Sequence, residues 1–85
     1  MVRSNVTVKM SGGLETRPIA MLVQLASQFQ SRVHLESGTK SVNAKSIMGM
    51  MTLGIDNGDD VIVTAEGPDE KEAVEKLRSF LGQNS

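Results

Sequence analysis

Cysteine, tryptophan and tyrosine are absent from this sequence of 85 residues, and histidine occurs once, as His34. Without cysteine there is neither a disulfide framework nor a thiolate zinc site. A single histidine excludes a histidine-cluster metal site, and the lack of tryptophan and tyrosine excludes an aromatic platform for stacking nucleic-acid bases. The side chains that most often carry redox, metal or base-stacking chemistry are therefore almost missing, and we expect no metal and no cofactor.

A strong net charge and a long apolar run are missing as well. Nine basic residues against ten acidic ones give a formal charge of −1, which favours neither nucleic acid nor an anionic membrane surface. No apolar run approaches the ~20 residues of a membrane span, and no signal peptide opens the sequence. The length suits one small domain. We therefore expect a single cytoplasmic domain over residues 1–85 that is not an enzyme.

Alternation of apolar and polar residues predicts the strands. It is found around residues 5–10, 32–36 and 61–66, where the period of two is typical of a strand with one buried face. After a turn at residues 37–39, residues 40–43 are expected to return as a hairpin partner. The residues expected to face the core from the three alternating segments are Val6, Val8, Met10, Val33, Leu35, Val61, Val63 and Ala65.

Helical spacing of apolar residues follows the first strand. Thr16 is expected to be the N-cap of this helix, and Pro18 suits its first turn, where a missing N–H costs nothing. Apolar residues at this spacing form one face of an amphipathic helix. The expected face comprises Ile19, Leu22, Val23, Ala26 and Phe29, widened by Met21 and Leu25.

Two further helices are expected, a short one over residues 46–53 and a long one near the end. Asp69 and Glu72 have the spacing of a capping box, and Gly82 is expected to end the last helix. Its buried stripe is expected to comprise Ala73, Val74, Leu77, Phe80 and Leu81. The order β-α-β-β-short α-β-α predicts an α+β domain, with both long helices on one face of a four-stranded, mostly antiparallel sheet.

The histidine and the aspartates of this sequence are weak candidates for a catalytic or metal-binding site. His34 alternates with apolar neighbours in its strand, so it is expected to point away from the core as a solvated residue. Asp56, Asp59 and Asp60 lie in a turn that lacks the longer calcium-binding pattern ending in a bidentate glutamate. Turn formation and solvation explain these aspartates better than a metal does.

Gly12 and Gly13, just before the first helix, suggest an anion cradle. The Gly-Lys-Ser/Thr continuation of a P-loop is missing. Free backbone N–H groups and the cation of Arg17 nevertheless make this helix start a suitable place for a phosphate to approach.

Ser46 has two readings at the start of the short helix. Its hydroxyl suits an N-cap that accepts a backbone N–H. It also suits phosphorylation, because a phosphate of about −2 charge is tolerated at the positive end of a helix dipole. Phosphorylation there would create a binding site for an arginine-bearing partner without remodelling the fold.

Apolar side chains follow Ser46 directly. Ile47, Met48 and Met51 lie at i, i+1 and i+4 of the short helix. Methionine fills irregular cores, and it also forms adaptable docking surfaces. Core packing and docking are both open for these residues, and a serine beside an exposed apolar patch is typical of a docking site gated by charge.

Two segments resemble the HPr family, the histidine-containing phosphocarriers of the bacterial sugar phosphotransferase system. Residues 13–18, GLETRP, resemble the family's active-site pattern Gly-Leu/Ile-His-Ala-Arg-Pro. Residues 43–51, NAKSIMGMM, resemble the regulatory-serine segment of the Gram-positive members. Length and element order match over essentially the whole chain, so the resemblance implies the HPr-like open-faced β-sandwich.

The sequence departs from the family at the active site. Glu15 stands where the family has its phosphoryl-accepting histidine, while Thr16 and Ile19 replace alanines beside it. We therefore expect that phosphocarrier activity is lost, and His34 is too far along the sequence to substitute. Glu15 is open to three readings: a permanent mimic of phosphohistidine, a partner that holds back Arg17, or an anion tolerated at a helix start.

Loss of the histidine with retention of the serine resembles the members of the family that act in carbon catabolite repression. The resemblance implies that HPr kinase/phosphorylase phosphorylates Ser46 with ATP. It also implies that the phosphorylated form binds the catabolite control protein CcpA, a repressor of the LacI type, as a corepressor that does not itself contact DNA. The contact residues implied by the resemblance are Arg17, Ala20, Val23, Ser46, Ile47, Met48 and Met51.

Two other functions and one assembly remain open at this point. A phosphoryl-transfer component could use Glu15 as an acyl-phosphate acceptor. A modulator could instead bind a metabolic enzyme in its unphosphorylated form. A homodimer formed by exchange of the N-terminal edge strand is also open, because a small domain with such an edge can swap it between protomers.

Overall fold

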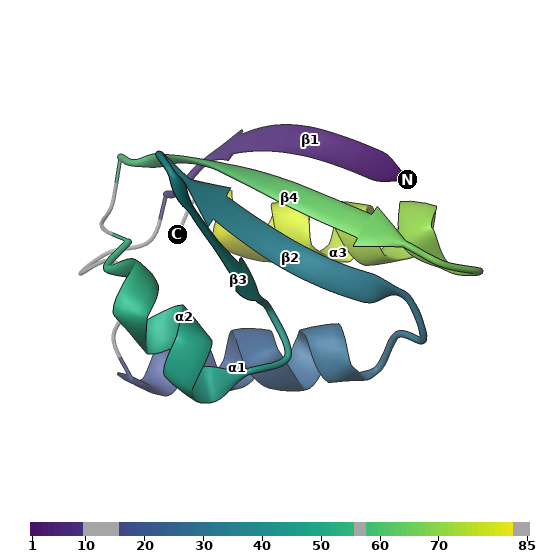
Figure 1. The fold of residues 1–85 in the computed structure, drawn as a ribbon, viewed down its shortest axis with the longest axis horizontal. Helices are drawn as coiled ribbons and strands as arrows, with labels where there is room; N and C mark the ends of the chain where they lie inside the picture. The colour runs from purple at the N-terminus through teal and green to yellow at the C-terminus, as the bar shows by residue number, and fades with distance from the viewer. Residues whose placement is uncertain (10–15, 56–57, 83–85) are drawn as a thin grey trace.

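The computed structural model describes residues 1–9, 16–55 and 58–82, with residues 16–18 described through their backbone alone. Seven elements follow one another along the chain (Figure 1). They are β1 (Val2–Thr7), α1 (Thr16–Ser27), β2 (Arg32–Ser37), β3 (Lys40–Asn43), α2 (Ile47–Leu53), β4 (Asp60–Glu66) and α3 (Glu70–Leu81). The expected element order is confirmed.

The four strands form one sheet in the order β1-β4-β2-β3, and every pairing in it is antiparallel. All three helices lie on the same side of this sheet, and its other face is left open (Figure 1). The predicted α+β architecture is therefore confirmed. A sheet that is covered on one side requires strands that alternate buried and exposed residues, which is the pattern of this sequence.

Cross-strand neighbours place the alternating apolar residues of the strands on the covered face. Val6 lies opposite Val61, and Leu35 lies between Val63 and Val42. The helices contribute the buried residues Ile19, Leu22, Ala26, Met50, Leu53, Ala73, Val74, Leu77 and Leu81, and the connecting loops contribute Val8, Ala44 and Ile55. Burial of apolar area at roughly 25 cal/mol per Å² is the main force that holds these layers together.

The edges of several elements differ from the predicted ones. β1 begins at Val2, earlier than expected, because it pairs with β4 along its whole length. Thr16 lies inside α1 as its first residue, whereas an N-cap precedes the helix, so that cap prediction is wrong. Phe29 lies beyond the end of α1 and is only partly buried, and Met21 is exposed instead of widening the buried face. The predicted core residue Met10 lies outside the described residues.

The capping box predicted for α3 is wrong. Asp69 is the N-cap residue, but its carboxylate makes no cap hydrogen bond. It instead accepts from the backbone N–H of Gln30 at 2.9 Å, the N–H of Ser31 at 2.9 Å and the hydroxyl of Ser31 at 2.5 Å. Ser31 is buried, so its N–H and hydroxyl need a hydrogen-bond acceptor within the protein. Leaving them without one would cost more free energy than losing the cap hydrogen bond of Asp69.

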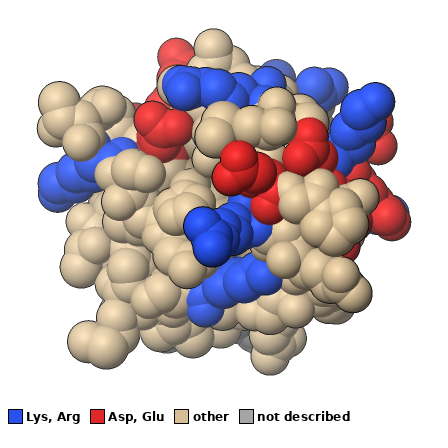
Figure 2. All heavy atoms as spheres, turned by 45° about the vertical axis from the view of Figure 1, so that its right-hand side comes forward, with Lys and Arg blue, Asp and Glu red and all other residues tan. Residues whose placement is uncertain are grey.

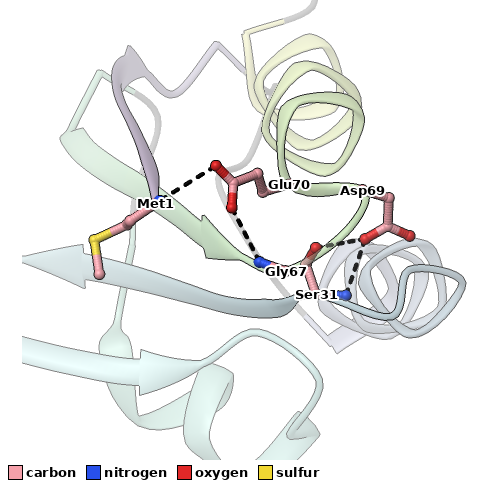
Figure 3. A network of polar contacts seen from close by, with 5 residues as sticks. All are labelled: Met1, Ser31, Gly67, Asp69 and Glu70. Carbon is pink, nitrogen blue, oxygen red and sulfur yellow. Dashed lines mark hydrogen bonds and ion pairs between the residues drawn. The ribbon is translucent and has the colours of Figure 1, made fainter.

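Glu70 reaches back from the first turn of α3 to Gly67 and to the N-terminus. One oxygen of the Glu70 carboxylate accepts from the Gly67 N–H at 3.1 Å, and the other lies 3.2 Å from the N-terminal ammonium of Met1. Figure 3 shows Glu70 between these two partners, with Asp69 turned toward Ser31. The two adjacent carboxylates thus tie the start of α3 to β1, to the end of β4 and to the loop before β2.

Gly67 makes the close packing of the β4–α3 turn against Ser31, which we call the β4–α3 junction, sterically feasible. Its φ is +153°, which residues with a side chain rarely adopt, and a Cβ built on it would lie 2.6 Å from Cα and Oγ of Ser31. The backbone of the turn between β4 and α3 therefore packs directly against Ser31.

Both carboxylates of this junction are held in their charged form. The hydrogen bond from the Ser31 hydroxyl, followed by that from the Gln30 amide, lowers the pKa of Asp69. The Gly67 amide, followed by the N-terminal ammonium, lowers the pKa of Glu70. A carboxyl group whose pKa is lowered by folding stabilises the fold above its unfolded pKa, and that stabilisation is lost as the pH falls.

We predict that Asp69→Asn lowers Tm at pH 7 by about 5–10 °C, because the amide cannot accept all three hydrogen bonds. We also predict that its Tm falls less than that of the wild type as the pH is lowered below about 4, the ordinary pKa of an aspartate, because only the wild type loses the stabilisation of a carboxylate whose pKa is lowered by folding. Thermal unfolding followed by circular dichroism at a series of pH values measures both effects. Glu72→Gln, at an exposed position in the same helical turn, is the matched control. An Asp69→Asn curve parallel to the wild-type curve would contradict the assignment.

Candidate functional site

Ser46 caps α2, as the sequence predicts. Its backbone is extended, with φ −110° and ψ 114°, and its Oγ accepts the N–H of Gly49 at 3.2 Å. Its carbonyl oxygen accepts the N–H of Met50 at 3.0 Å. The helix stops at Gly54, whose φ of 63° is the left-handed conformation in which helices commonly end. The hydroxyl of a half-buried serine is therefore held at the start of a helix of 7 residues.

Residues before Ser46 fix its position against α1. The backbone N–H of Lys45 donates to the side-chain oxygen of Asn43 at 2.8 Å, and Ser46 N–H donates to the Asn43 carbonyl at 3.0 Å. The Lys45 ammonium donates to the carbonyl oxygen of Phe29 at 2.7 Å, just past the end of α1. Sequence reasoning missed this anchor, because the acceptor lies 16 residues earlier and no local pattern indicates it.

The two faces of α2 have opposite roles. Met50 and Leu53 are buried and pack into the core. On the opposite face, Ile47 is 43% exposed, Met48 78% and Met51 52%. We call these three residues the α2 patch. Of the two alternatives left open for Ile47, Met48 and Met51, core packing is therefore excluded, and Met50 is the methionine of α2 that fills the core.

Charged side chains are absent from α2, whose sequence is IMGMMTL. Figure 2 shows charged side chains over the upper, central and right-hand parts of the face drawn, and an uncharged area at its lower left. An exposed apolar group without charges beside a hydroxyl has the composition of a docking surface.

The structure describes the side chains of two of the three α1 residues implied by the resemblance. Ala20 and Val23 are half-buried on α1, which contacts α2. Arg17 lies in the first turn of α1, and its side chain is outside the description. Glu15 and the predicted anion cradle at Gly12 and Gly13 also lie outside the described residues.

Other candidates from the sequence belong to the sheet and not to α1 or α2. His34 is half-buried on β2, where it lies opposite Thr64 and Asn43 on the open face of the sheet, as predicted. Asp60 accepts the Thr7 hydroxyl at 2.7 Å, while Asp56 lies outside the described residues.

Residues 1–9, 16–55 and 58–82 contain neither a metal-binding cluster nor a membrane-spanning helix. No group of three or more histidine, aspartate or glutamate side chains could hold a metal ion among these residues. Over the same part of the chain, no helix has the length and apolar character needed to cross a membrane.

Comparison with known proteins finds relatives that share both sequence and fold with this chain. The family model described as "PTS HPr component phosphorylation site" matches residues 2–83. The chain belongs to the HPr family. It is 48% identical to the HPr-like protein Crh of Bacillus subtilis over 95% of both chains.

Solved structures of HPr-family members share the fold over nearly the whole chain. The phosphocarrier protein HPr of Bacillus anthracis superposes with a TM-score of 0.92 at 42% identity, covering 94% of this chain and 95% of that one. The crystal structure of Bacillus subtilis Crh, the catabolite repression protein, is described as a domain-swapped, intertwined dimer. It superposes with a TM-score of 0.80 at 46% identity, covering 100% of this chain and 98% of that one.

We predict that Ser46→Ala lowers the free energy of unfolding by about 0.5–2 kcal/mol, because the N–H of Gly49 loses its acceptor. Ser46→Asp is the matched control, since aspartate is also a good N-cap, and it should retain most of the wild-type stability. Urea unfolding followed by circular dichroism measures both variants. Equal unfolding midpoints for Ser46→Ala and wild type would show that the cap has no energetic role.

Proposed function

We propose that this protein is a regulator of carbon catabolite repression whose activity is controlled by phosphorylation of Ser46. HPr kinase/phosphorylase transfers the phosphoryl group from ATP, and the phosphorylated form binds a CcpA-type repressor of the LacI class as a corepressor. The observation that carries the proposal is the position of the Ser46 hydroxyl at the start of α2, directly before the exposed, uncharged α2 patch. The 48% identity to Crh supports the same role.

Phosphoryl transfer at Ser46 requires only the hydroxyl of this chain. The bond between Oγ and the γ-phosphorus forms, the bond from that phosphorus to the bridging oxygen of ATP breaks, and the hydroxyl proton passes to a base of the kinase. The phosphate brings about −2 charge and strong acceptor oxygens. Because α2 contains no acidic residue, the new charge meets no like charge on its own helix.

The phosphate and the α2 patch supply complementary parts of the binding energy. A charge-assisted hydrogen bond from a basic residue of the repressor to the phosphate contributes about 1.5–3 kcal/mol, which corresponds to roughly ten- to more than a hundredfold in affinity. Burial of Ile47, Met48 and Met51 adds an apolar contribution that does not depend on phosphorylation. The proposed contact surface also includes Arg17, Ala20 and Val23 on α1.

Glu15 supports the absence of a phosphocarrier role in sugar transport. The imidazole that accepts phosphate in the family is replaced by a carboxylate in this sequence. His34 does not substitute, because it lies on the open face of the sheet, opposite the face that the helices cover. We propose that the protein is a cytoplasmic binding partner and not an enzyme.

Dimer formation is a further part of the proposal. β1 is one of the two edge strands of the sheet and pairs with β4 alone among the strands that the structure describes. The domain-swapped dimer of Bacillus subtilis Crh supports a homodimer of this chain by exchange of that strand.

We predict that HPr kinase/phosphorylase and ATP add about 80 Da to the wild type and nothing to Ser46→Ala, as measured by intact-mass spectrometry. Phosphorylation should raise the affinity for the repressor at least tenfold in a titration. Met48→Ser in the phosphorylated form should weaken binding, whereas Met21→Ser, at an exposed methionine of α1, should not. A wild-type chain that gains no mass would overturn the proposal.

We predict that incubation with phosphoenolpyruvate and Enzyme I leaves the mass unchanged, since no histidine stands at position 15. Glu15→Gln should leave the affinity of the phosphorylated protein for the repressor unchanged, as expected of an anion that is merely tolerated at a helix start. A stable adduct after the first treatment would favour a phosphocarrier role. A changed affinity in the second would assign Glu15 an active part in binding.

A further inference from the structure

Methionine is the readily oxidised residue type of this chain. Cysteine, tryptophan and tyrosine are absent, and six methionines are present. Oxidants such as hydrogen peroxide or hypochlorous acid convert the methionine thioether into a sulfoxide, and reductases reverse the change. Oxidation would therefore act on this protein mainly through its methionines.

Adjacent methionines of α2 differ sharply in exposure. Met48 and Met51 are largely exposed on the α2 patch, whereas Met50 is only 1% exposed. Solvent reaches the sulfur atoms of an exposed side chain, and close packing in the core excludes oxidants from a buried one. One short helix thus presents two oxidisable sulfur atoms to solvent and protects a third.

We propose that Met48 and Met51 form a reversible oxidation site that switches off docking through α2. The inference rests on the proposed function, because the α2 patch is its docking surface. In the reaction, the sulfur lone pair attacks one peroxide oxygen, the O–O bond breaks, and water leaves with the second oxygen. The sulfur loses two electrons and the peroxide gains them. In the reverse reaction, a dithiol removes the sulfoxide oxygen as water and becomes a disulfide.

A sulfoxide changes the surface without entering the core. Its oxygen is a strong hydrogen-bond acceptor, and α2 supplies no charged side chain that could pair with it. Burial of an unpaired polar group against an apolar partner surface is costly. Oxidation of Met48 and Met51 should therefore weaken docking roughly tenfold or more. The core retains Met50 and Leu53, so the fold persists.

Exposed methionines outside α2 provide internal controls. Met21 is 53% exposed and lines a shallow hollow between α1 and α3, together with Leu25 and Phe80. Met1 is 71% exposed at the N-terminus, where its ammonium pairs with Glu70. Oxidation at these positions leaves the α2 patch unchanged, so it should not reduce docking.

The test treats the phosphorylated protein with limiting hydrogen peroxide and follows each methionine by peptide mass spectrometry. Met48 and Met51 should be oxidised much faster than Met50, while Tm stays within a few degrees of the untreated value. Affinity for the repressor should fall at least tenfold, and methionine sulfoxide reductase with dithiothreitol should restore it. Met48→Leu/Met51→Leu should keep its affinity under peroxide, whereas Met21→Leu should lose affinity as the wild type does.

Retention on a hydrophobic-interaction column gives a second readout that needs no repressor. Retention should fall further on oxidation of the wild type and of Met21→Leu than on oxidation of Met48→Leu/Met51→Leu, in which only the exposed methionines outside α2, such as Met1 and Met21, can change. If the untreated phosphorylated protein fails to bind the repressor, the proposed function fails, and the oxidation map and retention still decide the oxidation site. Met50 oxidised as fast as Met48 in the folded protein, or an oxidised wild type with unchanged retention, would overturn the inference.

Discussion

The helix α2 has 7 residues and can bury only one of its faces against the covered side of the sheet. The exposure of the α2 patch follows from that constraint. Met50 and Leu53 occupy the buried face of α2. Ile47, Met48 and Met51 are left outside, because the remaining apolar residues of the helix have no second layer to cover them. The proposed docking surface is thus the unburied half of a helix whose other half is buried in the core.

Ser46 couples the local stability of α2 to the proposed signal. The oxygen that accepts the Gly49 N–H is also the atom that would receive the phosphoryl group. Because Lys45 and Asn43 fix the residues just before it, this atom has a defined position relative to α1 and to the α2 patch. The proposed modification therefore adds charge at a preformed surface, which suits recognition by a partner without refolding of the protein.

Most elements of the fold, and the buried side of each, could be predicted from the sequence. Alternation identified β1, β2 and β4, the turn after β2 identified β3 as its hairpin partner, and a short apolar stretch behind the Ser46 cap identified α2. The role of Asp69 could not be predicted in the same way, because its carboxylate satisfies Ser31, 38 residues away, instead of its own helix. Lys45 is a similar case, since its acceptor belongs to the loop after α1. Local patterns describe only groups that are near in sequence, whereas buried polar groups take whichever partner the packing provides.

By itself the sequence determined the order of the elements, the faces they bury, the loss of histidine at position 15 and the presence of a serine at the start of a short apolar helix. Tertiary structure alone decided which methionines of that helix are core and which are surface, because the division depends on where α2 lies against α1 and the sheet. It also decided that Asp69 holds the loop before β2 instead of capping α3. In both cases the outcome was set by packing between segments distant in the chain, which no local periodicity records.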